Sequence, residues 1–218
     1  CFNFAKLIAR FKHKDITKIG SGNPGTMNMS REFGLKVGII TFFCDAFKGG
    51  IPALISYFVY RGYVFAGSDV IVADFTRYFC GACVIIGHIY PVTMKFRGGK
   101  GIASTLGLFW INLGCENPWF LLVGFAAFWL IAFYIVGTEW GSMGSLIGVS
   151  GFGVWQAILF WFPYRAEPSN IYVVLLFLLI FLIDFLTWFA HRKNIMRLLA
   201  GEEHRTSVKK MVSKKKKA

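Results

Sequence analysis

Long apolar stretches alternate with short polar ones along most of this chain. Residues 119–137 contain no charge and residues 171–190 contain one, and each stretch is about as long as a bilayer requires. A hydrocarbon core about 30 Å thick needs about 20 residues of helix. Three further stretches reach this length with a few polar interruptions, at 37–60, 70–92 and 142–162. The pattern therefore predicts membrane-spanning helices.

A sixth apolar stretch, residues 102–114, is too short to span alone and is predicted to form a half-span or a tilted helix. We therefore predict an all-α integral membrane protein with about six transmembrane helices. Composition agrees, because 56% of the 218 residues are hydrophobic, more than a soluble domain of this length can bury. Residues 1–190 are expected to form one membrane domain, followed by a polar segment at 191–205 and a basic, disordered tail at 206–218.

Basic residues are distributed unevenly between the apolar stretches. The chain holds 24 Lys plus Arg against 11 Asp plus Glu, a formal net charge of +13. If six helices alternate in direction, most of these basic residues fall on one side, in the segment before residue 37, the loop at 95–100 and the part after residue 190. Because positively charged loops stay inside, this side is expected to face the cytoplasm.

The chain opens on Cys1 rather than Met, and residues 1–11 look like the last turns of a helix, so we expect an N-terminally truncated chain that lacks one membrane helix. Cys80 and Cys83 form a CxxC pair on a predicted membrane helix, which is interpreted as packing. Adding His88 leaves a zinc site without an apparent fourth ligand, so no metal is expected.

Two glycine-rich loops interrupt the apolar pattern, "GSGNPGTMN" at 20–28 and "KFRGGKG" at 95–101. Glycine allows backbone N–H groups to converge on an anion, and a helix that begins after the loop adds its positive end. The candidate phosphate-binding residues are Gly20, Ser21, Gly22, Asn23, Gly25, Thr26, Asn28 and Arg31 in and after the first loop, and Gly98, Gly99, Lys100 and Gly101 in the second. Neither loop fits GxxxxGK[ST] or GxGxxG, which disfavours a nucleotide ligand.

A third polar cluster follows the last apolar stretch and contains His191, Arg192, Asn194 and Arg197. Three polar, basic segments on one membrane face favour an anionic, phosphate-bearing ligand. The structural alternatives are tight helix connections and basic side chains that anchor at the interface. His88 lies at the end of a predicted membrane helix, close to the second loop, and is a further candidate for the site. The alternative is that His88 only packs within the bundle.

Asp45 and Lys48 lie inside an apolar stretch, three positions apart and therefore on one helix face. Charged groups inside a membrane are candidates for function, and the structural alternative is an ion pair that faces the bundle. Asp184 lies in the last apolar stretch without such a partner in the sequence.

Three segments together resemble the signatures of one family, in order and spacing: "SGNPGTMNMSREFGLKVGIITFFCDAFKGGIPA", "GHIYPVTMKFRGGKGIASTLG" and "HRKNIMRLLAGEEHR". The family is the bacterial acyl-phosphate:glycerol-3-phosphate acyltransferases, called PlsY. The resemblance implies a seven-helix enzyme of the bacterial plasma membrane, with its motifs and C-terminus in the cytoplasm. Such an enzyme moves a fatty acyl group from acyl phosphate to the sn-1 hydroxyl of glycerol 3-phosphate, giving lysophosphatidic acid and phosphate for phospholipid synthesis. No cofactor or metal is implied, and the expected partners are the two substrates and the lipid bilayer, with no nucleic acid and a monomeric state.

The resemblance also implies roles for individual residues. The expected catalytic residues are Ser21, His88, Lys100, His191 and Asn194. The expected substrate-binding residues are Gly20, Gly22, Asn23, Gly25, Asn28, Arg31, Gly98, Gly99, Gly101 and Arg192. Two positions depart from the family pattern: Met27 stands where a threonine is usual, and Lys193 stands where the last motif has a glutamate.

An acyl phosphate is already activated, so the enzyme needs chiefly to bring two anions together, orient the hydroxyl and neutralise developing charge. The general base is left open between His88, His191 and a phosphate oxygen of the donor. A transporter or flippase for a phosphorylated solute is the rival hypothesis, disfavoured because no internal repeat is visible and the glycine breaks lie at helix ends. A non-catalytic membrane scaffold is a second rival.

Overall fold

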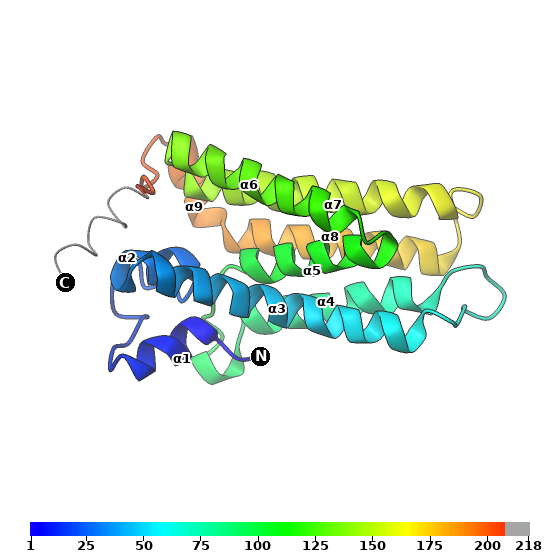
Figure 1. Cartoon of the computed structure of the whole chain (residues 1–218), viewed down its shortest axis with the longest axis horizontal. Helices are drawn as coiled ribbons and strands as arrows, with labels where there is room; N and C mark the ends of the chain where they lie inside the picture. The colour runs from blue at the N-terminus through cyan, green and yellow to red at the C-terminus, as the bar shows by residue number, and fades with distance from the viewer. Residues whose placement is uncertain (208–218) are drawn as a thin grey trace.

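A computed structural model of the chain describes residues 1–207. Within that range the secondary structure consists of α-helices and one short 3-10 helix, and no β-strand is formed beyond an isolated bridge between Val64 and Ile71. The long helices lie side by side along the long axis of the molecule (Figure 1). The predicted all-α class is therefore confirmed, while the predicted tail at 206–218 lies, from residue 208 onward, outside the described residues.

Among the described residues, five segments are long and apolar enough to cross a membrane. Four of them are the single helices α3 (Leu35–Tyr60), α6 (Phe120–Thr138), α7 (Gly141–Tyr164) and α8 (Ile171–Ala190). The fifth, Val72–Met94, joins α4 (Val72–Ile89) to the 3-10 helix η1 (Val92–Met94). These are the five stretches that the hydrophobic pattern predicts to be long enough to span.

The sixth predicted stretch forms helix α5 (Ile102–Glu116), which has 15 residues and so extends about 22 Å at 1.5 Å per residue. This short helix packs against α3, α4, α6, α7 and α8. Its contact with α3 is between backbones, because a side chain at Gly107 would collide with the main chain of Ala46 and one at Gly49 would collide with that of Ser104. Glycines on both helices therefore let α5 approach α3 closely, which places α5 at the centre of the bundle.

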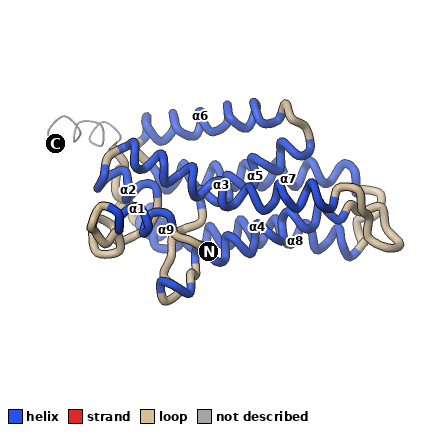
Figure 2. The backbone as a smooth tube through the Cα atoms, turned by 60° about the horizontal axis from the view of Figure 1, so that its bottom comes forward, coloured by secondary structure: helices blue, strands red, loops and turns tan. Residues whose placement is uncertain are grey.

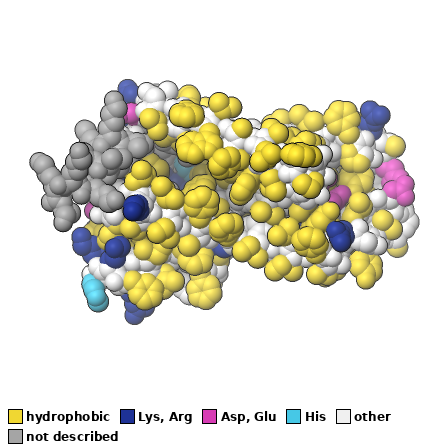
Figure 3. All heavy atoms as spheres, in the orientation of Figure 1, with side chains coloured by type: hydrophobic (Ala, Val, Ile, Leu, Met, Phe, Trp, Pro, Cys, Tyr) yellow, Lys and Arg dark blue, Asp and Glu magenta, His cyan; other side chains and the backbone are white. Residues whose placement is uncertain are grey.

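Four short elements gather at one end of the bundle: α1 (Phe4–Phe11), α2 (Thr26–Phe33), η1 and α9 (Arg192–Leu199) (Figures 1 and 2). Both glycine loops and the third polar cluster lie at this end, which we call the polar end. Lys and Arg side chains collect there on the face shown in Figure 3, and few appear along the middle of the bundle. The predicted alternation of six helices is the physical reason, since every second connection returns to the same end.

Apolar side chains cover the flanks of the bundle (Figure 3). Large residues such as Phe133, Phe181 and Leu130 are more than 60% exposed, although they lie on long helices. In water such a surface would be an aggregation hazard, whereas a lipid environment matches it. The inner faces form the main core, and a small separate cluster, centred on Ala5, Ala9, Ile16 and Met29, holds α1 against α2.

The end opposite the polar end is fastened by a buried ionic cluster. Arg77 is fully buried and donates hydrogen bonds to Asp74 at 2.6 Å and Glu116 at 2.5 Å. The hydroxyl of Tyr164 donates to the second oxygen of Asp74. These bonds join α4, α5 and α7, so the cluster is interpreted as structural.

Candidate functional site

The first glycine loop is held by a buried asparagine. Asn28 accepts a hydrogen bond from the backbone N–H of Ser21 at 3.0 Å and donates to the carbonyl of Ile19 at 3.1 Å. Gly20 and Gly22 have φ angles of +58° and +69°, a region that favours glycine. The predicted residue Asn28 therefore shapes the loop with its side chain, and it leaves Ser21 exposed at the polar end.

Helix α2 begins directly after this loop with Gly25 as its N-cap, and no side chain caps it. The predicted positive helix end is therefore present behind the loop. Arg31, in the last turn of α2, donates to the hydroxyl of Thr206 at 3.1 Å. This bond brings Arg31 close to the third polar segment, as the hypothesis of one common site requires.

The second glycine loop is strapped to the end of α4. The N–H groups of Gly98 and Gly99 donate to the carbonyls of Ile89 and His88, at 3.0 and 3.1 Å. A side chain at Gly98 would collide with the His88 carbonyl, and one at Gly99 would collide with the His88 ring. In this structure the two N–H groups are thus occupied, so the expectation that they converge on an anion is not met; these glycines serve close packing instead.

Lys100 follows this loop and reaches into a polar network. Its ammonium donates to the side-chain oxygen of Asn194 at 2.5 Å, which joins the second loop to α9. Burial lowers the pKa of Lys100 to about 8; the carboxylate of Glu203 opposes this shift, while the cations of Arg197 and Arg31 add to it. The structure therefore brings together Lys100, Asn194 and Arg31, three of the predicted site residues.

Glu203 is the anion at the centre of this network, and sequence reasoning missed it. Its carboxylate, 8% exposed as a residue, accepts hydrogen bonds from Ser142 at 2.5 Å, Asn194 at 2.6 Å and Arg197 at 2.8 Å. Burial raises the pKa of Glu203, but these three hydrogen bonds outweigh burial and leave the pKa below its ordinary value. The signal was present in the third segment, where the acidic pair of "LAGEEHR" interrupts a basic run.

A turn after α9 places Glu203. Gly201 has a φ angle of +73°, so the chain can reverse there and return along the start of α7. The N–H of Thr206 donates to the carbonyl of Glu139 at 2.7 Å, and Arg205 donates to the carbonyl of Thr138 at 3.0 Å. Segment 202–206 therefore covers the network, and Ser142 joins the site from α7 although no motif predicted it.

The ring of His191 is oriented by the last turn of α8. Its Nδ1 lies 2.8 Å from the carbonyl oxygen of Thr187. Because a carbonyl only accepts, Nδ1 carries the proton and Nε2 keeps a lone pair. Burial, with the nearby Lys100 cation, lowers the pKa of His191 to about 4, so the ring is neutral at pH 7. His191 therefore has the protonation state that a general base requires.

Of the charged residues predicted inside the bundle, Asp45 has a partner and Asp184 has a carboxylate oxygen without a hydrogen-bond partner among the described residues. The Asp45–Lys48 ion pair is formed, with 2.5 Å between Lys48 Nζ and Asp45 Oδ1, and Lys48 Nζ lies 2.7 Å from His88 Nδ1. Asp184 has a buried oxygen without a hydrogen-bond partner in residues 1–207, as its isolation in the sequence indicates.

Arg192 lies apart from the network. It is exposed, donates to the carbonyl of Phe189 at 3.0 Å and stacks on the Phe189 ring at 4.5 Å. This placement does not support its expected role in substrate binding. Lys193, the departure in the last motif, is also exposed, so its charge lies outside the buried network.

Two buried hydroxyls were missed by the sequence reasoning. Ser104 and Thr105 are fully buried in the first turns of α5, and their hydroxyls have no hydrogen-bond partner within the described chain. They stand in "GGKGIAST", directly after the second glycine loop. No group of three His, Cys, Asp or Glu side chains placed to hold a metal ion occurs in residues 1–207.

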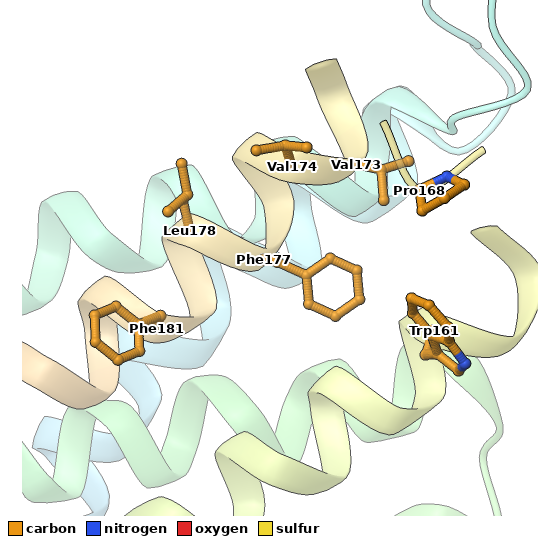
Figure 4. Close-up of a pocket in the computed structure, with 7 residues that line it drawn as sticks. All are labelled: Trp161, Pro168, Val173, Val174, Phe177, Leu178 and Phe181. Atoms are coloured by element: carbon orange, nitrogen blue, oxygen red, sulfur yellow. The ribbon is translucent and has the colours of Figure 1, made fainter. Parts of the chain in front are cut away.

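Two apolar pockets lie along the bundle at different distances from the network. One, of about 370 Å³, lies between α7 and α8 toward the far end and includes Trp161 and Phe177 (Figure 4). The other, of about 330 Å³, is bordered by α7, α8 and α9 and includes Met143, Trp188 and Leu198. Met143 is the neighbour of Ser142, so the second pocket adjoins the polar network.

Comparison with known proteins gives concordant matches. The model of the family described as glycerol-3-phosphate acyltransferase matches residues 1–201. A protein of that name from Aquifex aeolicus is 37% identical over 202 residues, covering 93% of this chain and 91% of that protein. A second, from Mycoplasmopsis pulmonis, is 34% identical, covering 92% of this chain and 85% of that protein.

Two solved structures of an integral membrane glycerol 3-phosphate acyltransferase, PlsY, have the same fold. The glycerol 3-phosphate form superposes with a TM-score of 0.67 at 32% identity, covering 93% of this chain and 88% of that chain. The lysophosphatidic acid form also gives a TM-score of 0.67, at 31% identity, covering 97% of this chain and 91% of that chain.

Proposed function

The chain belongs to the glycerol-3-phosphate acyltransferase family, and from this premise and the polar network we propose how it works. It is a multi-pass membrane enzyme that acylates glycerol 3-phosphate to lysophosphatidic acid. We propose that the acyl donor is an acyl phosphate and that both substrates meet at the polar end of the bundle. The transporter and scaffold hypotheses are thereby replaced.

The observation that carries this proposal is the gathering of three cations around the network of Asn194 and Glu203. The second loop supplies Lys100, α2 supplies Arg31, and α9 supplies Arg197, which reaches the same carboxylate as Asn194. Two phosphate-bearing substrates bring several negative charges to one place, and a cluster of half-buried cations lowers the cost of bringing them together. Ser21 and the first turn of α2 are proposed to complete the phosphate pocket.

The proposed reaction is a direct acyl transfer. The sn-1 hydroxyl oxygen of glycerol 3-phosphate attacks the acyl carbon, a new C–O ester bond forms, and the C–O bond to phosphate breaks. Phosphate leaves with the bonding electron pair, and the hydroxyl proton passes to a base. We propose His191 as that base, because it is neutral and holds a lone pair on Nε2. Lys100 and Arg31 neutralise charge on the phosphates.

We propose that the acyl chain lies in the apolar pocket next to the network, between α7, α8 and α9. The pocket is apolar at Met143, Trp188 and Leu198, and it begins beside Ser142, so a fatty acyl tail could lie there while its phosphate reaches Lys100. We also propose that the polar end faces the cytoplasm, because most Lys and Arg residues lie there.

The test uses the full chain in detergent or lipid, with palmitoyl phosphate and glycerol 3-phosphate. Phosphate and lysophosphatidic acid are measured together, and equal amounts of both are expected. Palmitoyl-CoA is the matched donor control and should give no product. Product from palmitoyl-CoA but not from palmitoyl phosphate would overturn the proposed donor.

The site is tested in the same assay with Lys100→Met. This variant should lose at least about 100-fold in kcat/KM, since a charge that contacts phosphate is removed. Arg165→Met removes an exposed cation at the opposite end and should leave the rate unchanged. Near-normal activity of Lys100→Met would refute the site.

A further inference from the structure

A buried polar triad connects α3 to the end of α4 beneath the second glycine loop. It consists of Asp45, Lys48 and His88, with Asp45 1% and His88 5% exposed. The resemblance implies a catalytic role for His88, but neither it nor the comparisons with known proteins assign a role to Asp45 or Lys48. Their distances are short: 2.5 Å between Asp45 and Lys48, and 2.7 Å between Lys48 and His88.

The bonds of Lys48 determine where the proton of His88 lies. A lysine ammonium has three N–H donors and no acceptor. Lys48 Nζ meets three partners: Asp45 Oδ1, the carbonyl oxygen of Phe2 at 3.0 Å and Nδ1 of His88. Because the ammonium has no lone pair, it can only donate to the ring, and Nδ1 must accept. A ring that accepts at Nδ1 is neutral and carries its proton on Nε2.

The Nε2 edge of His88 faces the second glycine loop. A side chain on Gly99 would come closest to Nε2 and then to the two ring carbons beside it. The backbone of Gly99 is also bonded to the same histidine, because its N–H donates to the His88 carbonyl at 3.1 Å. Gly99 immediately precedes Lys100, so the ring supports the loop that presents the proposed phosphate-binding cation.

We propose that Asp45 and Lys48 are positioning residues that hold His88 as a neutral imidazole protonated on Nε2, so that His88 presents a hydrogen-bond donor to the glycine loop and does not serve as the general base. What the loop binds rests on the proposed function, whereas the tautomer does not. His191 has the opposite arrangement, because its Nδ1 donates to Thr187 and its Nε2 keeps the lone pair. The two histidines that the sequence could not rank are thereby given different roles.

Nitrogen NMR of the full chain labelled in its histidines tests the tautomer directly. The chain has four histidines, so the His88 signals are assigned by their loss in His88→Gln. We expect a protonated Nε2 and an unprotonated Nδ1 throughout the range from about pH 6 to about pH 8. A proton on Nδ1, or on both nitrogens, would overturn the proposal. This readout does not depend on enzymatic activity.

Removal of the supporting charges tests the positioning role. Lys48→Met and Asp45→Asn should each let the His88 ring exchange between tautomers, so that its two nitrogen signals move toward each other. Asp184→Asn is the matched control, because it also neutralises a carboxyl group within a membrane helix, but on α8 and against Gly153 of α7. If the His88 signals stay the same in folded Lys48→Met, Lys48 does not position the ring.

Activity separates a donor from a base at position 88. A glutamine amide can donate from about the place of Nε2 but cannot accept a proton at neutral pH, whereas alanine does neither. We expect His88→Gln to keep kcat within about tenfold of the unmodified chain and His88→Ala to lose about 100-fold or more. Equal losses in both variants would identify a base and refute the proposal. If the unmodified chain forms no product, the proposed function fails, and the NMR result still decides the tautomer.

Discussion

Alkaline pH should inactivate this enzyme through Lys100 while leaving the fold intact. The ammonium of Lys100 is half-buried near Arg197 and Arg31, and its loss of solvation lowers its pKa from 10.5 to about 8. This difference corresponds to about 3 kcal/mol against the charged form, at about 1.4 kcal/mol for each pH unit. The hydrogen bond to Asn194 holds the group in place.

The size of the effect follows from the fraction of Lys100 that is charged. With a pKa of about 8, about nine in ten molecules carry the charge at pH 7 and about one in ten at pH 9. If the charged form binds the phosphate of glycerol 3-phosphate, kcat/KM should fall about tenfold between these values. The substrate phosphate does not titrate there, because its second pKa is about 6.

Through Lys100, rising pH changes the stability of the fold in the opposite direction to the activity. The unfolded chain holds the Lys100 proton up to about pH 10.5, whereas the folded chain releases it near pH 8. Between these values the unfolded chain binds more protons, so the contribution of Lys100 to the free energy of unfolding increases with pH. Loss of activity above pH 8 cannot then be attributed to loss of stability at this residue.

Initial rates at limiting glycerol 3-phosphate, at constant ionic strength, provide the assay, with phosphate and lysophosphatidic acid measured together. Lys100→Arg is the matched control, because a guanidinium stays charged through pH 9 and should abolish the alkaline decline while keeping part of the activity. A flat profile in the unmodified chain, or the same decline in Lys100→Arg, would refute the reasoning.

Three further outcomes are expected. Gly99→Ala should raise the KM for glycerol 3-phosphate at least about tenfold in the same rate assay, because the added carbon collides with the His88 ring. Gly62→Ala is the control, because a carbon added there has nothing within 4 Å, and it should leave this KM unchanged. Glu203→Gln should lower the free energy of unfolding by about 1.5–3 kcal/mol, because a neutral amide accepts weaker hydrogen bonds from Asn194 and Arg197 than the carboxylate does. The midpoint of thermal unfolding should fall accordingly, and an unchanged midpoint would contradict this expectation. Arg77→Met should lower the free energy of unfolding by about 3–5 kcal/mol, because the buried carboxylate of Asp74 and the partly exposed carboxylate of Glu116 lose their cation. The kcat of the folded protein should stay unchanged, which a purified folded fraction can test.

The departure at Met27 lies in the first turn of α2, beside the first glycine loop. The structure shows no contact that a threonine hydroxyl at position 27 would make. The other departure, Lys193, is exposed, so replacing it with glutamate would not place a charge in the buried network. We therefore expect neither position to prevent the arrangement in which Lys100 donates to Asn194 and Asn194 donates to Glu203.

Apolar length and the placement of charge were enough to predict the helices and the gathering of the polar segments. Both are one-dimensional properties, since a bilayer selects helices by length and alternating helices return every second loop to the same end. Residues 102–114 were recognised as too short to span, but their central position was not, because it depends on glycines such as Gly49 and Gly107 that allow two helix backbones to touch.

Atomic roles within the site needed the tertiary structure. Glu203 looks like a surface acid in the sequence, and it becomes a buried partner of Asn194 because Gly201 turns the chain back over the network. The rings of His88 and His191 look alike in the motifs, yet Lys48 makes one accept at Nδ1 and the Thr187 carbonyl makes the other donate there. The sequence alone determined which residues reach the polar end of the membrane helices, because hydrophobic length and charge act locally along the chain. The tertiary structure decided what each side chain donates, accepts or excludes, because those properties depend on neighbours that are distant in sequence.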